Sequence, residues 1–264
     1  SGENLALQHK FEGQDLQQIK KGTSDAESVT VSFYVKANAA FTFGVELYDN
    51  DNTRQITKLY NTTTGWVRHE LTFPADTTGA FDDDNALSLD LNFWLHAGSD
   101  WAGGTLNTSA WASSTNANRA AGIGSFFSST DNEFFLTGVQ LEIGSQATNF
   151  EHRSFGEELA LCQRYYEQII KAAGFCYSTS SMNFDIFFKT TKRADPSNSL
   201  IDDSVVTDSA GIGAKTSSGS SIVGSDVEVD GASARIDGFS SLTAQRAYPT
   251  FGQNTAWIAY DAEL

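Results

Sequence analysis

Apolar and polar residues alternate with a period of two along much of the first half of the chain. Val31 and Phe33, for example, alternate with Thr30, Ser32 and Tyr34. Successive side chains of a β-strand point to opposite faces, so this period predicts strands with one buried face. On this basis we expect strands at residues 29–37, 41–49, 55–60, 66–74, 88–98 and 134–144.

The alternating pattern returns after residue 174, in shorter segments. Gly- and Ser-rich turns separate these segments, and we expect strands at residues 182–190, 220–224, 226–239 and 255–264. Short alternating segments joined by turns are typical of all-β domains. The chain has 264 residues, of which 40% are hydrophobic, and this is enough for two such domains.

The last strand of the first half leads into a helix start. Ser154 stands three residues before Glu157, which is the spacing of a capping box. In that motif the Ser hydroxyl and the Glu carboxylate each bind the other residue's backbone amide, so a helix is predicted to begin after Ser154. In the strand itself, one face is expected to carry every second residue: Phe135, Thr137, Val139, Leu141 and Ile143.

Two interpretations remain open for the residues that follow this helix start. In the first, one continuous helix carries the apolar residues from Leu159 to Ile169 on a single face. In the second, a short helix ends near Cys162 and a strand covers residues 164–170. Adjacent tyrosines and adjacent isoleucines within that range favour the second interpretation, because such side chains suit a pleated sheet.

Together these elements predict an all-β protein with three parts. Residues 1–150 are expected to form an N-terminal jelly-roll β-sandwich, because five or more antiparallel strands without a helical period fit that fold. Residues 151–173 are expected to form a junction with a short helix. Residues 174–264 are expected to form a smaller C-terminal β-sandwich domain.

The charge balance excludes two classes of partner. The chain has 17 Lys and Arg against 33 Asp and Glu, which gives a formal net charge of −16. Most of its surface would repel the phosphates of nucleic acids and the anionic headgroups of membranes, so we expect neither as a partner. No apolar run approaches the ~18 residues needed to span a bilayer.

Recognisable catalytic motifs are missing from the sequence. None of the four histidines has the spacing of a catalytic or zinc-binding motif, so we expect no enzymatic activity. One enzymatic alternative stays open, a carboxylate pair for glycoside hydrolysis, because a sequence contains no distances. Cys162 and Cys176 are expected to be small buried apolar residues rather than a disulfide.

Aromatic residues provide the first candidate binding site. Sugar rings stack their C–H faces on Trp and Tyr, while neighbouring amides and carboxylates bind the hydroxyls. The Gly-, Ser- and Asn-rich segment 99–130 is too long for a plain connection, which favours a functional loop. The alternative is that Trp94, with Trp66, closes an edge of the sandwich. The candidate carbohydrate-binding residues are Trp101 and Trp111 in this segment, and Trp94 and Tyr60 on predicted strands.

Acidic residues provide the second candidate site. Asp82, Asp83 and Asp84 follow one another in a predicted turn. Carboxylate and carbonyl oxygens from flexible loops are the ligands that Ca²⁺ prefers, so these three residues form the candidate metal site and Ca²⁺ is the candidate cofactor. The alternative is a solvated turn without a metal.

Several of these segments are similar to known proteins. VTVSFYVKA, GWVRHELTF, SLDLNFW and FFLTGVQLEIG resemble successive strands of the carbohydrate-binding-module jelly roll. GVQLEIGSQATNFEHRSFGEELALCQRYY, GTSDAESVTVSFYVKAN and GAFDDDNALSLDLNFWLHAGS resemble tail-fibre and related virion proteins of bacteriophages, many of them marine. The resemblance covers about residues 1–168 and is weaker in the C-terminal domain.

The resemblance implies an extracellular protein on the surface of a virion, such as a tail fibre. It implies a homotrimer that contacts a host cell-surface glycan and other virion proteins. Two alternatives stay open. One is a structural fibre or decoration protein that assembles without binding a glycan, and the other is a polysaccharide depolymerase.

Overall fold

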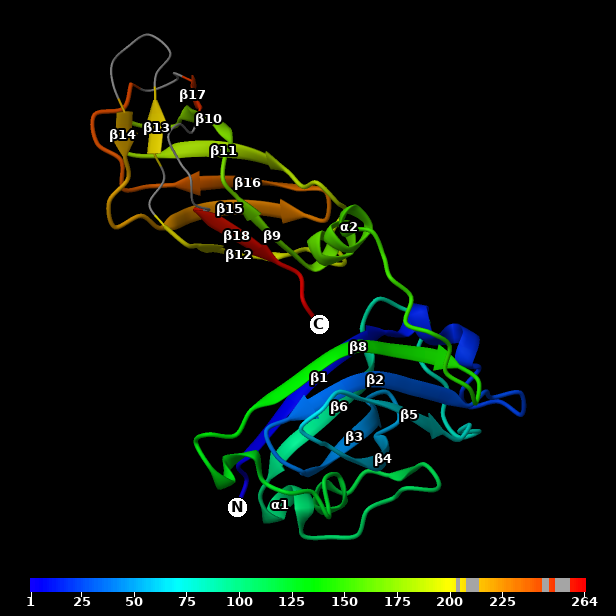
Figure 1. The fold of residues 1–264 in the computed structure, drawn as a ribbon. Helices are drawn as coiled ribbons and strands as arrows, with labels where there is room; N and C mark the ends of the chain where they lie inside the picture. Colours follow the sequence, from blue (N-terminus) through cyan, green and yellow to red (C-terminus); the bar gives the residue numbers. More distant parts are fainter. Residues whose placement is uncertain (203–204, 208–213, 244–246, 250–256) are drawn as a thin grey trace. The chain divides into compact units, whose positions relative to one another are not determined.

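The computed structural model describes residues 1–202, 205–207, 214–243, 247–249 and 257–264. It confirms the all-β fold class, since most elements are strands of antiparallel sheets (Figure 1). The chain divides into two compact units, Ser1–His152 with Leu264 and Arg153–Glu263. No helix within these described ranges is long and apolar enough to cross a bilayer.

The first unit is a β-sandwich of two antiparallel sheets. Because β1, β2 and β3 alternate between the sheets, as do β4, β5 and β6, the connections cross the sandwich as in a jelly roll. The five-stranded sheet has the order β1 (Asn4–Glu12), β6 (Leu87–Ala97), β3 (Thr42–Asp49), β4 (Arg54–Asn61) and β7 (Ala112–Ser113). The three-stranded sheet has the order β5 (Val67–Phe73), β2 (Val29–Ala37) and β8 (Phe134–Ile143).

Short helical segments lie in the connections of the first unit: η1 (Gly13–Ile19), α1 (Ser99–Ala102), η2 (Asn116–Asn118) and η3 (Phe126–Ser128). Strand β1 is absent from the predicted set. Its apolar residues do not form a clearly buried face, since Leu7 is exposed and Phe11 is only half-buried. Pairing with β6 along its whole length, rather than its own pattern, defines β1 as a strand.

The core of the first unit lies between its two sheets. Val31, Phe33 and Val35 of β2 are fully buried there, as the alternation predicts. Phe33 packs edge-on against Phe93 of β6, with ring centroids 5.1 Å apart. Removing one such ring from a core costs about 3–5 kcal/mol, so contacts of this kind hold the two sheets together.

Strand β8 contains a β-bulge at Gly138. Ser32 of β2 pairs with Gln140, whereas Tyr34 pairs with Thr137, so β8 has one residue more than β2 over this stretch. Gly138 has φ +59°, a left-handed conformation that glycine adopts at low cost. The extra residue is therefore accommodated at the one position of the bulge that lacks a side chain.

Because of the bulge, odd-numbered residues before Gly138 and odd-numbered residues after it point to opposite faces of the sheet. The prediction that Phe135, Thr137, Val139, Leu141 and Ile143 share one face is therefore wrong. Phe135 pairs with Lys36 and is exposed. Leu141 pairs with Val31 and packs against the core, as does Leu136. A period of two holds only on each side of the bulge, because the inserted residue reverses the alternation.

We expect Gly138→Ala to lower the free energy of unfolding by about 1–2 kcal/mol, because a left-handed backbone is strained for any residue with a Cβ. A Cβ at this position would also lie 3.1 Å from Cδ2 of Tyr34. Equilibrium urea denaturation measures the difference. Gly65→Ala is the control, since its Cβ would have no neighbour within 4 Å. Equal losses in the two variants would contradict the prediction.

The second unit contains helix α2 and further antiparallel sheets (Figure 1). A five-stranded sheet has the order β15 (Ile222–Glu228), β16 (Gly231–Ile236), β11 (Met182–Phe187), β10 (Ala173–Cys176) and β17 (Ala247–Pro249). A three-stranded sheet has the order β12 (Ser197–Leu200), β18 (Ile258–Asp261) and β9 (Tyr166–Ile169), and β13 (Val205–Thr207) pairs with β14 (Ala214–Thr216). Its core is built on the fully buried Met182, Phe184, Ile236, Trp257 and Tyr260.

The predicted strands of the second half are present with changed bounds. Segment 226–239 is not one strand, because a turn that ends at Asp230 separates β15 from β16. The first two residues of the predicted strand 255–264 lie outside the described residues, and β18 occupies its middle. The turn between β15 and β16 is so short that the alternation shows no clear break there. The alternation alone therefore does not locate the strand ends.

The junction follows the second of the two interpretations. Helix α2 (Phe155–Tyr165) is followed directly by strand β9. The capping box is confirmed, since Ser154 accepts from the amide of Glu157 and its own amide donates to Glu157 Oε2 at 3.0 Å. Both α2 and β9 belong to the second unit rather than to a separate junction. Cys176 is buried as expected, but Cys162 on α2 is exposed.

Candidate functional site

Residues 99–130 cover the outer face of the five-stranded sheet in the first unit. The amide of Thr57 donates to the carbonyl oxygen of Asn107 at 2.9 Å, and the amide of Gly124 donates to that of Thr42 at 2.7 Å. Both faces of β6 are consequently buried over most of its length. The long segment is therefore part of the folded structure rather than an open binding loop.

A buried charged network lies under this segment. Arg119 Nε and Nη2 donate to Oε1 and Oε2 of Glu46 at 2.8 and 2.9 Å. Asn92 Nδ2 and Trp94 Nε1 also donate to Oε2 of Glu46, at 3.1 and 2.8 Å. The guanidinium of Arg119 stacks 4.1 Å from the ring centroid of Tyr48. Four donors satisfy the Glu46 carboxylate, so this network stabilises the fold and leaves no group for a ligand.

Two of the four predicted carbohydrate-binding residues are buried. Trp94 is 4% exposed and Tyr60 is 3% exposed, so neither ring presents a face to a ligand. Tyr60 points into the core and packs edge-on against Phe33, with ring centroids 5.0 Å apart. Burial also raises the pKa of Tyr60. The prediction that these two rings bind a sugar is wrong.

The other two, Trp101 and Trp111, are half-buried and held by contacts within the first unit. Trp101 Nε1 donates to the carbonyl oxygen of Gly2 at 3.2 Å, and its ring packs on that of Trp94. Trp111 Nε1 donates to the carbonyl oxygen of Pro74 at 2.9 Å, and its ring packs against the core. Both residues support the covering segment, and the structure does not bring the four predicted aromatic residues together in an open groove.

The predicted metal site is not formed. Asp82, Asp83 and Asp84 are exposed, and the Asp84 carboxylate accepts a hydrogen bond from the amide of Ala86 at 2.9 Å. Among the residues that the structure describes, no group of three or more His, Cys, Asp or Glu is arranged to hold a metal ion. The three aspartates form a solvated turn, which was the alternative interpretation.

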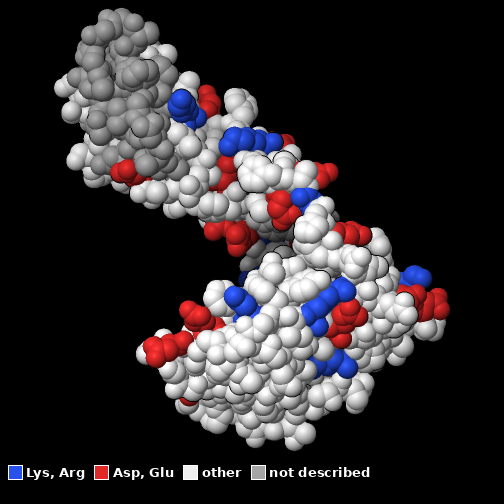
Figure 2. Space-filling view, viewed as in Figure 1, with Lys and Arg blue, Asp and Glu red and all other residues white. Residues whose placement is uncertain are grey.

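Exposed aromatic side chains lie on the outer face of the three-stranded sheet. Trp66, Phe135 and Tyr34 are 50%, 42% and 37% exposed. Lys36 Nζ lies 5.4 Å from the ring centroid of Trp66 and 4.6 Å from that of Phe135, and Arg68 lies 5.9 Å from that of Tyr34. Figure 2 shows charged side chains scattered over a mostly uncharged surface on the face of the first unit in view. Cations of the chain itself therefore already occupy these ring faces.

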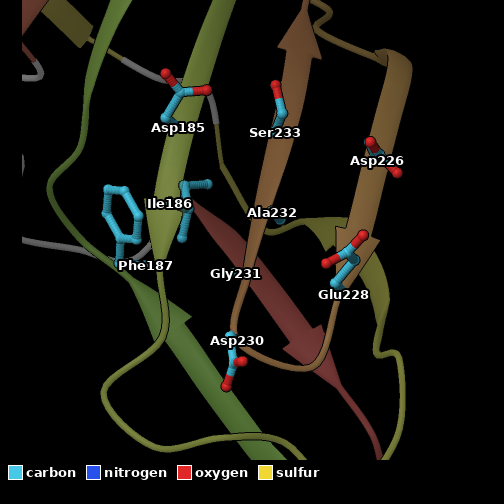
Figure 3. A pocket seen from close by; sticks show the side chains of 9 residues that line it. All are labelled: Asp185, Ile186, Phe187, Asp226, Glu228, Asp230, Gly231, Ala232 and Ser233. Carbon is cyan, nitrogen blue, oxygen red and sulfur yellow. The ribbon is translucent and has the colours of Figure 1, made fainter.

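The second unit carries an open trough of about 390 Å³ on the outer face of β11, β16 and β15 (Figure 3). The central strand contributes only small residues to its floor. A Cβ built on Gly231 would lie 2.6 Å from the carbonyl oxygen of Ile186, so no side chain fits there. Cross-strand pairing sets two rows of residues across the trough: Asp185, Ser233 and Asp226, then Phe187, Gly231 and Glu228.

The side chains around this trough are available to a ligand. Phe187 is 85% exposed. Within the described part of the chain, the carboxylates of Asp185, Asp226 and Glu228 have no ion pair or hydrogen-bonding partner, whereas Asp230 accepts from Thr191 Oγ1 at 2.7 Å. An exposed aromatic ring and three unpaired carboxylates thus share one face of three paired strands, and we take this arrangement as the candidate functional site.

The sequence contains only a weak signal for this site. Residues 182–190 are recognisable as a strand, but its outward residues have nothing that separates them from other exposed positions. Asp185 lies 41 positions before Asp226, and only the pairing of β11, β16 and β15 places both on one face. Long-range strand order is not encoded in a local pattern, so the site could not be found from the sequence.

The fold and this surface define a class: a two-unit, all-β protein with a sandwich in its first unit and an exposed sheet face in its second. No protein-family model matches the chain, and no curated protein matches it in sequence.

Proposed function

We propose that this protein binds host-cell glycans as a surface protein of a bacteriophage virion, of the tail-fibre kind. The observation that carries the glycan proposal is the trough of the second unit, which is lined by the exposed Phe187 and by three unpaired carboxylates. The virion and its extracellular location rest on the sequence resemblance of residues 1–168.

Each part of the trough has a role in this proposal. Phe187 is the platform on which the C–H face of a sugar ring stacks. Asp185 and Glu228 accept hydrogen bonds from sugar hydroxyls, and a hydrogen bond to an ionised carboxylate is stronger than one to a neutral acceptor. The small residues Gly231 and Ser233 leave the room in which the sugar lies. No step of this proposal requires catalysis or a metal ion.

The charge of the trough determines which glycans fit. Three unpaired carboxylates would repel uronic acids and sulfated sugars. Neutral sugars, and amino sugars with a free ammonium group, meet no such repulsion. We therefore propose a neutral or amino-sugar polysaccharide of the host surface as the ligand.

Phe187→Ala is expected to weaken glycan binding about fivefold or more, because stacking on an aromatic ring contributes about 1 kcal/mol or more and the hydrogen bonds alone position a sugar poorly. A glycan array identifies the ligand, and isothermal titration calorimetry measures the dissociation constant of both proteins. Phe187 is 85% exposed, so its removal leaves the core of the second unit intact.

The matched control is Phe127→Ala, which removes another exposed Phe, 59% exposed, from the first unit. This variant should bind as tightly as the native chain. The proposal fails if no host-derived polysaccharide binds at millimolar concentration, with or without Ca²⁺. A ligand that binds both variants equally would place the glycan site away from the trough.

A second function is favoured by a different observation. None of the residues of helix α2 is buried, although it carries several large apolar side chains. A helix in this state suits a structural virion protein that assembles with further chains. Assembly and glycan binding use different parts of the second unit, so the two functions are compatible.

A further inference from the structure

The outer face of the five-stranded sheet continues beyond the trough of the second unit. On β11, Asn183 lies two residues before Asp185, and on β16, Arg235 lies two residues after Ser233. Residues two positions apart in a strand point to the same face, and cross-strand pairing places Arg235 opposite Asn183. The face therefore has a third row of residues, next to the row of Asp185, Ser233 and Asp226.

Two neighbours fix the side chain of Arg235, which is half-buried. Its Nε donates to Asn183 Oδ1 at 3.0 Å, and its Cζ lies 3.7 Å from the ring centroid of Tyr177, the residue that follows β10. The two Nη groups form the fork that binds a carboxylate through two hydrogen bonds. Among the described residues these Nη groups have no partner, so a guanidinium that is already oriented keeps its donors available.

The charges of the third row and of the trough do not neutralise each other. Diagonal neighbours in an antiparallel pair lie about 7–8 Å apart, which is within reach of a long side chain. Arg235 is the diagonal neighbour of both Asp185 and Asp226, but within the described part of the chain it forms an ion pair with neither. One face thus carries unpaired carboxylates in the trough and an unpaired cation beside it.

We infer that this face binds a zwitterionic glycan. The ammonium group of an amino sugar lies in the trough, and a carboxylate on another sugar unit binds Arg235. The inference rests on the proposed glycan binding, and it selects the amino sugar from the two ligand classes proposed above. Such a ligand provides the opposite charges that the chain itself does not pair. A glycan with a carboxylate on every unit is still repelled by the trough.

The separation of the charges requires a ligand of more than one sugar unit. Gly231, in the row of Phe187, and Arg235 are four residues apart on β16, which is about 13 Å along a strand. A single sugar ring does not span this length. Phe175 pairs with Asn183 and is 44% exposed, so each end of the face has an aromatic ring on which a sugar can stack.

Four probes with similar sugar backbones and different charges test the inference. Chitosan oligosaccharide carries ammonium groups, carboxymethyl cellulose carries carboxylates, carboxymethyl chitosan carries both, and cello-oligosaccharide carries neither. In mildly acidic buffer, which keeps the amino groups protonated, isothermal titration calorimetry should give carboxymethyl chitosan an affinity about tenfold or more above the other three. Non-specific attraction to a chain of net charge −16 would instead favour chitosan, the most cationic probe, and that order would overturn the inference.

Arg235→Gln should lower the affinity for carboxymethyl chitosan about tenfold, because it removes the cation that binds the carboxylate. The matched control is Arg164→Gln, which removes another half-buried Arg near a Tyr ring, 5.9 Å from the ring centroid of Tyr165. The control should bind like the native chain, and circular dichroism should give the native spectrum for both variants. Equal affinities of the native chain and Arg235→Gln for carboxymethyl chitosan would contradict the inference.

The outcomes separate this inference from the proposed function. If a host polysaccharide binds and Phe187→Ala weakens that binding, but carboxymethyl chitosan is not preferred among the probes, only the zwitterionic ligand is wrong. If neither a host polysaccharide nor any of the four probes binds at millimolar concentration, the proposed function fails as well.

Discussion

Arg119→Ala is expected to lower the free energy of unfolding of the first unit by about 3–5 kcal/mol. The side chain of Glu46 is fully buried, and among the described residues Arg119 is its only ion-pair partner. Removal of one member of a buried ion pair leaves an uncompensated charge in a medium of low polarity, which is strongly destabilising. The expected loss of stability is several times larger than the contribution of a solvent-exposed ion pair.

Fluorescence-detected urea denaturation measures this effect, since Trp94 and Trp101 both stack with Arg119, 5.5 and 5.3 Å from its guanidinium. Arg153→Ala is the control, because Arg153 and Glu158 form an ion pair in which both side chains are more than half exposed. The control should change stability by less than about 1 kcal/mol. Similar losses in the two variants would show that the Glu46 network contributes little.

Lys192→Ala is expected to destabilise the second unit by about 3 kcal/mol or more. The side chains of Lys192 and Glu167 are 0% and 1% exposed, and Lys192 Nζ lies 3.0 Å from Glu167 Oε2. The same ammonium group also binds the C-terminal end of α2, through the carbonyl oxygen of Gln163. Lys192→Ala therefore leaves the buried Glu167 carboxylate without this cation and removes a hydrogen bond that anchors α2.

The effect of Lys192→Ala depends on pH in a defined direction. Burial opposes ionisation of Glu167, but its hydrogen bonds with Lys189 and Lys192 outweigh burial and lower its pKa below the usual value. A lowered pKa stabilises the folded state above the pKa of the unfolded chain, about 4.3, and that stabilisation is lost as the pH falls through the folded-state pKa. The difference between native and variant proteins should therefore be largest at neutral pH and shrink in acid.

Hydrogen exchange of residues 153–263 measures this unit separately from the first one. The control is Lys189→Ala, which removes the exposed partner of Glu167; the Lys189 side chain is 64% exposed. In the control, the free energy of unfolding should fall by no more than about 1 kcal/mol. If amide hydrogens of Lys192→Ala exchange at the same rates as those of the native protein at neutral pH, the prediction is contradicted.

Much of the fold could be predicted from the sequence. The alternation around Phe33 identifies β2 and its buried face, and similar patterns identify most strands of the first unit. The spacing of Ser154 and Glu157 locates the start of α2, because a capping box is a local interaction between residues three positions apart. These predictions succeed because they depend on neighbours along the chain.

The candidate site could not be predicted in the same way. Trp94 alternates with inward residues and was expected to face a ligand, but residues 99–130 fold over that face and bury it. Conversely, Phe187 belongs to an ordinary alternating strand, and the trough beside it is formed by residues about 40 positions away on β15. Alternation shows that a side chain points away from the core, but it does not show what covers it.

The all-β class, the faces of the regular strands and the capped start of α2 follow from local sequence patterns, since period-two alternation and capping are local consequences of backbone geometry. Which outward faces stay open depends instead on contacts between distant parts of the chain. The loop over Glu46 and Trp94, the bulge at Gly138 and the assembly of β11, β16 and β15 all join residues distant in the chain. Such contacts depend on packing in three dimensions, and no local period records them.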